Sequence, residues 1–405
     1  MKKLAVHLTR SQQDFVPVGQ LAEADRRIYF EYAPEFIETG WQLSPFKFPL
    51  RPGLIEHTDR SFGSLPGLFD DSLPDAWGLL LMDRQFRRLG VDLQSVSPLD
   101  RLAYLGTRTM GALTYHPPQE LEPSDGMIDL HELVVNAQDV LAGEAREVLP
   151  ELIRAGGSPG GTRPKVLIGV RGTEIISGED DLPEGFEHWI IKFAARLEAR
   201  DAGPVEFAYA QMAQAAGIDM PAVRLFEVSK SLRCFGIRRF DRGSGNRRIH
   251  VHTFGNLIHA DFRIPGSDYR DLLKVTIALT RNHQDVVRGY RRMVFNIAAH
   301  NRDDHVKNFA FVMDDRGGWS LSPAYDLTYA PGPGGEHTTT VLGEGRNPTA
   351  EHCLGLAREF GIRDSEAKAI VDQVNEAVSK WPTYADEAGC TKKTAGQIAA
   401  RLTQL

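Results

Sequence analysis

The chain has 405 residues, 42% of them hydrophobic, which suffices for a large buried core and predicts two or three domains. A formal net charge of -7 does not supply the positive field that direct nucleic-acid binding needs, and three scattered cysteines (Cys234, Cys353 and Cys390) argue against a disulfide framework or a structural zinc site. The apolar runs are too short for a bilayer and the first residues lack a signal-peptide core, so we expect a cytoplasmic protein with no membrane partner.

The first 120 residues predict a β-rich unit. Apolar segments bounded by turn residues indicate strands at 3–8, 27–32, 43–49 and 111–115. Residues 73–88 form an amphipathic run with Pro74 near its start and Gly90 past its end, which predicts a helix. The acidic segment 119–129 contains Pro, Ser and Gly without periodicity, so we place the first domain boundary there.

Residues 121–240 are expected to form a second β-rich unit. A glycine-rich loop at 156–161 precedes a strand at 165–170, and another strand covers 188–193. A helix is predicted from Pro204 to Gly217. Residues 241–405 then become mostly helical, with an apolar stripe along 286–298 that is typical of core packing.

The strongest chemical signal is the octad 301–308, NRDDHVKN, which lies between the striped helix and a predicted hairpin at 309–321. In protein kinases an aspartate accepts the proton of the attacking hydroxyl, and an asparagine five residues later holds magnesium. Asp303 and Asn308 have this spacing, and Lys307 could steady the transferring phosphate. Asp326, downstream of the hairpin, could grip the metal that bridges the phosphates. The octad alone fits a polar turn equally well.

The order of residues upstream adds weight to the kinase interpretation. A kinase needs a strand lysine for the α- and β-phosphates and a helical glutamate that pairs with it. Lys192 lies in an otherwise apolar predicted strand, where its ammonium must meet an anion or escape to solvent. Glu206 lies in the first turn of the next predicted helix, where an acid also complements the helix dipole.

The glycine-rich segment is chemically ambiguous. It lacks the Gly-Lys-Ser/Thr ending of a Walker A motif and does not fit GxGxxG. Its backbone N–H groups could approach phosphates, and a plain surface turn explains the same composition.

The chain resembles the HipA family of bacterial toxin kinases over nearly its whole length. Several separate stretches carry the resemblance in the family's order, so it does not depend on one loop. They are Phe30-Glu31-Tyr32, Phe69-Asp70-Asp71-Ser72-Leu73-Pro74-Asp75, the segment from Leu105-Gly106 to Gly111-Ala112-Leu113, the loop around Ser158, Arg239-Phe240-Asp241-Arg242, and the set Asp303, Asn308 and Asp326.

The resemblance implies a role for each candidate residue. Asp303 would be the catalytic aspartate, Asn308 and Asp326 the magnesium ligands, and Lys192, with Glu206 as its partner, the phosphate-binding lysine. Further contacts to ATP are implied for Gly160, Gly161, Lys165, Arg238, Arg239 and Phe240, the last three near the adenine.

The resemblance also implies self-phosphorylation at Ser158, which in the family is associated with ejection of its loop and loss of activity. A dianionic phosphate there would be repelled by the phosphates of ATP. Pro159 and Pro164 fix φ and stiffen the loop, which sets this chain apart. Asn301 stands where eukaryotic kinases carry histidine, and the residues after Asp326 are not Phe-Gly, so eukaryotic activation-loop logic does not transfer.

Together these features predict an α+β, two-lobed kinase-like fold with a β-rich N-terminal subdomain, transferring the γ-phosphate of ATP to a serine or threonine. In the family, targets include aminoacyl-tRNA synthetases, and a HipB-type helix-turn-helix antitoxin binds both the kinase and operator DNA. The acidic pI agrees with DNA contact only through such a partner. Two alternatives remain: a small-molecule phosphotransferase of the aminoglycoside or choline kinase type, and an inactive kinase fold that acts as a corepressor.

Overall fold

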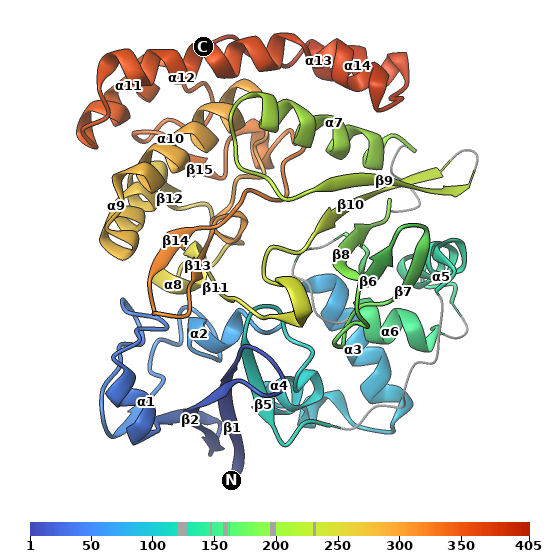
Figure 1. Cartoon of the computed structure of the whole chain (residues 1–405), viewed down its shortest axis with the longest axis vertical. Helices are drawn as coiled ribbons and strands as arrows, with labels where there is room; N and C mark the ends of the chain where they lie inside the picture. The colour runs from blue at the N-terminus through green and yellow to red at the C-terminus, as the bar shows by residue number, and fades with distance from the viewer. Residues whose placement is uncertain (120–127, 146–147, 157–160, 162, 195–199, 230–231) are drawn as a thin grey trace.

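The computed structural model describes residues 1–119, 128–145, 148–156, 161, 163–194, 200–229 and 232–405. Three bodies follow one another along the chain (Figure 1). The N-terminal unit lies at one end of the molecule, and the helices of the C-terminal tail lie along the opposite end. The sheet formed within residues 165–238 lies between these ends, beside the first helices of the C-terminal lobe.

The N-terminal unit is built on a five-stranded antiparallel sheet with the order β4-β3-β2-β1-β5. Alternating side chains of the strands point into a core shared with the helices, which is the pattern of a sheet with one buried face. The elements are β1 (Lys2–Thr9), β2 (Phe15–Ala24), β3 (Arg27–Tyr32), α1 (Pro34–Thr39), β4 (Leu54–Glu56), α2 (Gly67–Asp70), α3 (Ala76–Arg88), α4 (Pro98–Leu105) and β5 (Leu113–His116).

The strand predicted at 43–49 is wrong. This segment is a turn in which the Phe48 backbone N–H donates to the Ser44 carbonyl at 3.0 Å, and Phe48 is buried in the core. Pro45 and Pro49 have no N–H to donate to a strand ladder, so apolar character alone gave a false strand signal. The predicted helix is confirmed as α3, and Gly90 beyond it has a φ of 73°.

The second body is an antiparallel sheet with the order β7-β6-β8-β10-β9. Helix α7 contacts β9 and β10, while α6 packs beside β6 and α5 contacts β9. Trp77 and Leu81 of α3 enter the same core, so the N-terminal unit contributes to it. The elements are α5 (Leu130–Ala142), α6 (Pro150–Gly156), β6 (Lys165–Arg171), β7 (Glu174–Ser177), β8 (Glu187–Lys192), α7 (Ala202–Ala215), β9 (Val223–Ser229) and β10 (Leu232–Arg238).

The C-terminal lobe is mostly helical, and the predicted apolar stripe is confirmed as the buried face of α10. A short sheet with the order β11-β13-β14 carries the predicted hairpin. Among the described residues, none of the helices has the length and apolar character needed to cross a membrane. The elements are β11 (His250–Thr253), α8 (Phe254–Ile258), β12 (Ser267–Asp268), α9 (Tyr269–Thr280), α10 (His283–Ala298), β13 (Ala310–Met313), β14 (Trp319–Leu321), β15 (Thr339–Thr340), α11 (Ala350–Glu359), α12 (Asp364–Ser379), α13 (Trp381–Glu387) and α14 (Lys392–Ala399).

A buried ionic cluster joins the N-terminal unit to the segment that follows β10. Asp241 accepts the Gly111 backbone N–H at 2.7 Å and two hydrogen bonds from the guanidinium of Arg239 at 2.7 and 2.9 Å. Arg242 donates to Asp241 at 2.8 Å and to the carbonyls of Gly111 and Thr109. Burial alone would raise the pKa of Asp241, but Arg239 and Arg242 outweigh it and hold the pKa well below its usual range.

A second contact uses the acidic stretch before α3. Asp71 accepts from the Thr253 backbone N–H at 2.8 Å and from its hydroxyl at 2.7 Å. It also pairs with His252, whose other ring nitrogen lies 2.9 Å from the Ser44 hydroxyl. The chain of contacts from Asp71 through His252 to Ser44 resembles the catalytic triad of a hydrolase. Ser44 is fully buried, however, so its hydroxyl serves only as a structural hydrogen-bond partner.

Substituting Asp241 should weaken this interface severely. Asp241→Asn leaves two buried guanidinium groups without their anion, and we expect a loss of about 3–5 kcal/mol in unfolding free energy at neutral pH, measured by urea denaturation. Because the folded pKa is depressed, the carboxylate stabilises the protein fully above about pH 4, and this contribution is lost progressively as the pH falls below that value through the folded pKa.

The matched control is Asp315→Asn, which removes an exposed partner of Arg247. Such surface pairs contribute about 0–1 kcal/mol, so this variant should unfold close to the wild type. Equal denaturation midpoints for the two variants would show that the buried cluster does not hold the interface.

Candidate active site

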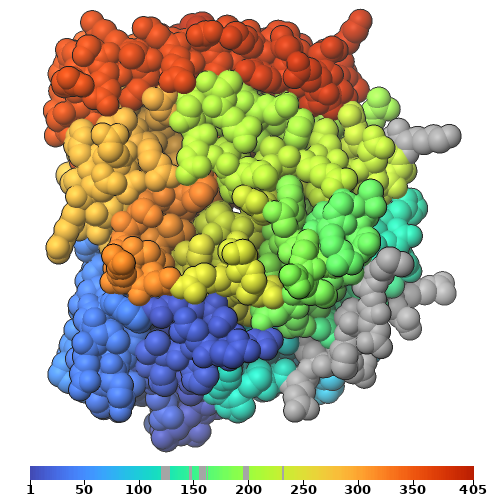
Figure 2. Space-filling view, viewed as in Figure 1, coloured from blue at the N-terminus to red at the C-terminus, as the bar shows by residue number. Residues whose placement is uncertain are grey.

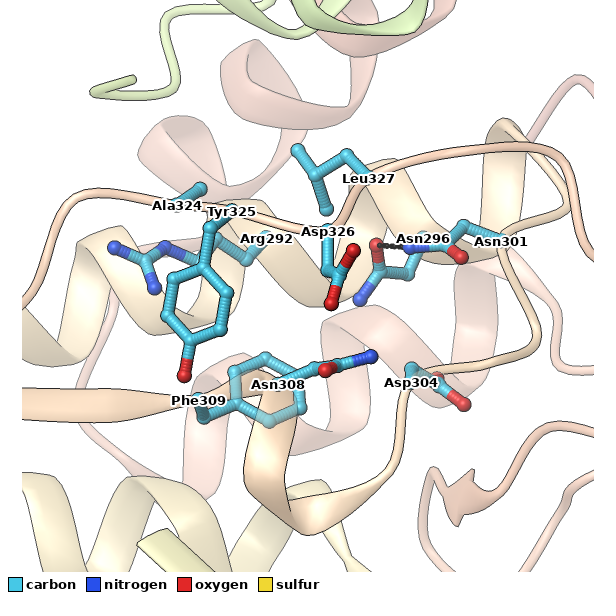
Figure 3. A pocket seen from close by; sticks show the side chains of 10 residues that line it. All are labelled: Arg292, Asn296, Asn301, Asp304, Asn308, Phe309, Ala324, Tyr325, Asp326 and Leu327. Carbon is cyan, nitrogen blue, oxygen red and sulfur yellow. Dashed lines mark hydrogen bonds between the residues drawn. The ribbon is translucent and has the colours of Figure 1, made fainter. Parts of the chain in front are cut away.

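A pocket lies where α10, the octad and the segment after β14 meet (Figure 3). All of its lining residues belong to the C-terminal lobe, and Lys192 of β8 reaches Asp326 from the second body. Figure 2 shows a hollow in the molecular surface between the green and the yellow-to-orange parts of the chain. The carboxylate of Asp326 and the amide of Asn308 face one another across it. The lining residues are Arg292, Asn296, Asn301, Asp304, Asn308, Phe309, Ala324, Tyr325, Asp326 and Leu327.

The central ion pair of the site joins three segments. Lys192, at the end of β8, extends its ammonium to the carboxylate of Glu206 on α7 and to that of Asp326. Glu206 is buried, whereas the side chain of Asp326 is 37% exposed. The strand lysine therefore meets its predicted helical glutamate, and a carboxylate 134 residues downstream joins them.

The charges of this group favour the ionised forms of Lys192 and Asp326. Burial alone would lower the pKa of Lys192, but Asp326 and Glu206 outweigh it and raise the pKa above its usual value. Burial alone would raise the pKa of Asp326, but Lys192 and Lys165 hold it well below its usual range. Asp326 also has a φ of 56°, in the left-handed region that non-glycine residues seldom adopt, which is a feature that clusters at functional sites.

Lys165 brings a second positive charge to the same place. It lies directly opposite Lys192 in the antiparallel pairing of β6 and β8, so both side chains project from one face of the sheet. Burial lowers the pKa of Lys165, and the neighbouring Lys192 lowers it further. Two ammonium groups therefore lie near the carboxylate of Asp326, whose pKa is lowered, and their positive charge suits an anionic ligand.

Asp303 and Asn308 are linked through the backbone of the octad. The Asn308 amide donates to the Asp303 carbonyl at 2.6 Å, and the residues 306–308 form a single turn of 3₁₀-helix. The Asp303 side chain is exposed, so its carboxylate is accessible to an incoming hydroxyl. Partial desolvation of its carboxyl raises its pKa, and the nearby charge of Asp326 adds to that rise.

Asp304, a residue with no role predicted from the sequence, anchors the octad to neighbouring segments. Its buried carboxylate accepts from the Tyr269 hydroxyl at 2.8 Å, from the Thr338 backbone N–H at 2.9 Å, and pairs with His337 at 2.9 Å. Figure 3 shows it turned away from Asp326. Asp304 therefore fixes the loop, while its neighbour Asp303 is left to face solvent.

The hydroxyl of Tyr269 continues the same network into the pocket wall. Asn296 donates to it at 2.8 Å, and Asn301 donates to Asn296 at 2.9 Å. All three residues are buried. These hydrogen bonds fix the end of α10 against the start of the octad.

The ammonium of Lys307 lies among carboxylates of the N-terminal unit. Its ammonium lies 3.2 Å from Asp75 and 3.5 Å from Asp70, both in the N-terminal unit, and 5.0 Å from the centre of the Phe262 ring. These carboxylates outweigh the effect of burial and raise the pKa of Lys307. Asp70 and Asp75 were identified from the sequence only within a family stretch, and their contact with Lys307 was not predicted.

Three of the remaining predicted nucleotide contacts, Arg238, Arg239 and Phe240, lie at the end of β10 and directly after it. Arg238, the last residue of β10, pairs with the exposed Glu187, and the Arg239 guanidinium is committed to Asp241. The Phe240 ring stacks on Tyr325, with 5.6 Å between the ring centres. Gly161 lies within the described residues, whereas Ser158 and Gly160 lie outside them.

The donor set fits one magnesium ion that shares its ligands with phosphate. The amide oxygen of Asn308 and the carboxylate of Asp326 are the hard oxygen ligands that Mg²⁺ prefers. Within the described ranges no group of three or more His, Cys, Asp or Glu side chains could hold a metal by itself. Phosphate oxygens and water would therefore have to complete the coordination, as is usual for Mg²⁺ at nucleotide sites.

Comparisons with known proteins identify the family of the chain and the fold that it shares with solved structures. The chain matches the family models described as the HipA N-terminal domain over residues 12–116 and the HipA-like C-terminal domain over residues 157–381. It is 26% identical to Y4dM of Sinorhizobium fredii (strain NBRC 101917 / NGR234), whose name provisionally assigns it to the kinases; the 388 aligned residues cover 90% of this chain and 88% of that protein. A HipA chain from the Shewanella oneidensis MR-1 complex of HipA, HipB and operator DNA superposes with a TM-score of 0.70 and 18% identity, covering 98% of this chain and 96% of the other.

The architecture is therefore a two-lobed, kinase-like α+β fold. The chain belongs to the HipA family. The C-terminal match contains Lys192, Asp303 and Asp326, and the N-terminal match contains Asp70 and Asp75.

Removing the charge of Glu206 should weaken nucleotide binding. In Glu206→Gln the ammonium of Lys192 keeps only Asp326 as its anion, so it is held closer to that carboxylate and is less well placed for phosphate. A charge-assisted hydrogen bond contributes about 1.5–3 kcal/mol, so we expect the Kd for Mg·AMP-PNP to rise by about 10- to 100-fold in isothermal titration calorimetry. Glu174→Gln, an exposed residue on β7 of the same sheet, is the control and should bind like the wild type; matching Kd values for both variants would contradict the assigned role of Glu206.

Proposed function

We propose that this protein is a Mg-ATP-dependent serine/threonine protein kinase and the toxin of a HipBA-like toxin-antitoxin module. The observation that carries the proposal is the ion pair of Lys192 with both Glu206 and Asp326, because it joins the three charged groups that a kinase uses to hold ATP and its metal. The depressed pKa of Asp326 keeps it ionised for a cation at any physiological pH.

Each residue has a separate task in the proposed reaction. Lys192 and Lys165 bind the phosphates of ATP, and Asn308 and Asp326 hold magnesium, which neutralises charge on the phosphates. Asp303 orients the acceptor hydroxyl and takes its proton as the hydroxyl oxygen bonds to the γ-phosphorus and ADP leaves. The raised pKa of Asp303 makes it a better base than an ordinary aspartate.

The proposed partners follow from the family and from charge. A HipB-like helix-turn-helix antitoxin would bind this protein and carry the contact with operator DNA, since the chain itself has a net charge of -7. The protein substrate would be a translation component such as an aminoacyl-tRNA synthetase, and self-phosphorylation would occur at Ser158. The N-terminal unit favours this proposal over a small-molecule phosphotransferase, because its carboxylates reach the octad.

Asp303→Asn tests the proposed base directly. Asn keeps the shape of the side chain but cannot accept the hydroxyl proton, so kcat for phosphoryl transfer should fall by about 10²- to 10⁴-fold. Transfer is followed with γ-labelled ATP and by mass spectrometry of Ser158, and expression of the variant should no longer arrest growth. Mg·AMP-PNP binding should stay within about twofold of the wild type, since Asp303 is exposed and separate from the Lys192 ion pair.

The control for growth arrest is Asp315→Asn, whose side chain is exposed and paired with Arg247. It should arrest growth like the wild type. Equal toxicity of wild type and Asp303→Asn, with equal transfer rates, would contradict the proposal. Nucleotide binding without transfer by the wild type would favour the corepressor alternative.

A further inference from the structure

Asp75 occupies a helix start without capping the helix. It is the residue that precedes α3, a position where an aspartate usually accepts a hydrogen bond from the first turn, yet its side chain makes no such bond. Its two carboxylate oxygens are used elsewhere. One accepts the Gly161 backbone N–H at 3.0 Å, and the other lies 3.2 Å from the ammonium of Lys307.

Lys307 is fixed at both of its ends. Its ammonium is held by Asp75 and Asp70, and its side chain is only 15% exposed. Its backbone carbonyl accepts the Tyr325 hydroxyl at 2.8 Å. The residues that directly follow these two in sequence are Asn308 and Asp326, so Lys307 and Tyr325 tie together the two segments that carry the candidate magnesium ligands.

Asp75 is therefore the first residue in a series of contacts that connects the N-terminal unit to the candidate magnesium ligands. The N-terminal unit supplies the carboxylate, the octad supplies the ammonium and the carbonyl, and the segment after β14 supplies the phenol. Asn308 directly follows Lys307 in the same single turn of 3₁₀-helix. A shift of the Lys307 backbone would move Asn308 with it and change its separation from Asp326.

We infer that Asp75 is a positioning residue through which the N-terminal unit sets the arrangement of Asn308 and Asp326 and anchors Gly161 beside them. The inference rests on the proposed function, since it assigns Asp75 to the proposed magnesium-nucleotide site. Lys307 acts in it as the link between Asp75 and the octad. The N-terminal unit is then a working part of the phosphotransfer site.

Two variants remove the carboxylate in different ways. Asp75→Asn keeps the size of the side chain, and Asp75→Ser keeps a residue that caps helices well, so a defect common to both is a loss of charge and not of the helix. The control is Asp25→Asn, an exposed residue in the turn between β2 and β3 with a φ of 52°, a conformation that asparagine tolerates.

The binding readout is the Mg²⁺ concentration that half-saturates binding of AMP-PNP, measured by calorimetry. We expect this concentration to rise by about tenfold in both Asp75 variants and to stay unchanged in Asp25→Asn, because residues that orient metal ligands typically affect metal affinity by about 10- to 100-fold. Lys307→Met should give a similar rise, and the double variant Asp75→Asn/Lys307→Met should be no worse than Lys307→Met alone. Wild-type Mg²⁺ dependence in both Asp75 variants, or additive effects in the double variant, would overturn the inference.

Amide hydrogen exchange separates this inference from the proposed function. Backbone amides of residues 306–308 should exchange faster in both Asp75 variants than in the wild type and in Asp25→Asn, with or without nucleotide. Faster exchange in a protein that transfers no phosphate would refute the proposed function and leave the positioning role intact. Unchanged exchange in these residues would refute the positioning role even in an active kinase.

Discussion

The ammonium of Lys192 between the carboxylates of Glu206 and Asp326 is the interaction on which the arrangement of the site depends. It joins the last residue of β8 and helix α7, which belong to the second body, to the segment after β14, which belongs to the C-terminal lobe. A partly buried lysine is costly unless anions compensate it, so the two carboxylates and the lysine require one another. The same charges make the site suitable for a phosphate chain with its metal, because anion and cation can replace the internal partners.

Two adjacent aspartates of the octad differ in burial and in bonding. Asp304 is buried and accepts hydrogen bonds from Tyr269 of α9 and from the segment that contains His337 and Thr338, so it fixes the loop, whereas the side chain of Asp303 is exposed. The ion pairs of Lys307 with Asp70 and Asp75 then connect this loop to the N-terminal unit. The buried cluster around Asp241 makes a second connection to the same unit. The N-terminal unit is thus bonded to the kinase-like part at several charged points.

The parts of the site that could be predicted from the sequence are those with a fixed spacing or order. The spacing of Asp303 and Asn308 predicted one loop that carries both residues, and the order of Lys192 before Glu206 predicted a strand lysine beside a helical glutamate, which the structure pairs. Helices α3 and α10 followed from capping residues and an apolar stripe. Contacts between distant segments carry no such local signal. The pairing of Lys307 with Asp75, 232 residues away, depends on how the N-terminal unit docks, and the burial of Asp304 cannot be told from that of Asp303 by residue type. The false strand at 43–49 had apolar residues but also two prolines, whose missing N–H groups decided the outcome.

The most direct test of the central claim is a crystal structure of the protein with AMP-PNP and Mn²⁺ in place of Mg²⁺, with the metal located by its anomalous scattering. The account predicts an anomalous peak bonded to the Asn308 amide oxygen and the Asp326 carboxylate, with the Lys192 ammonium on the phosphates and still paired with Glu206. A metal bound elsewhere, or a bound nucleotide that leaves Asn308 and Asp326 untouched, would contradict it.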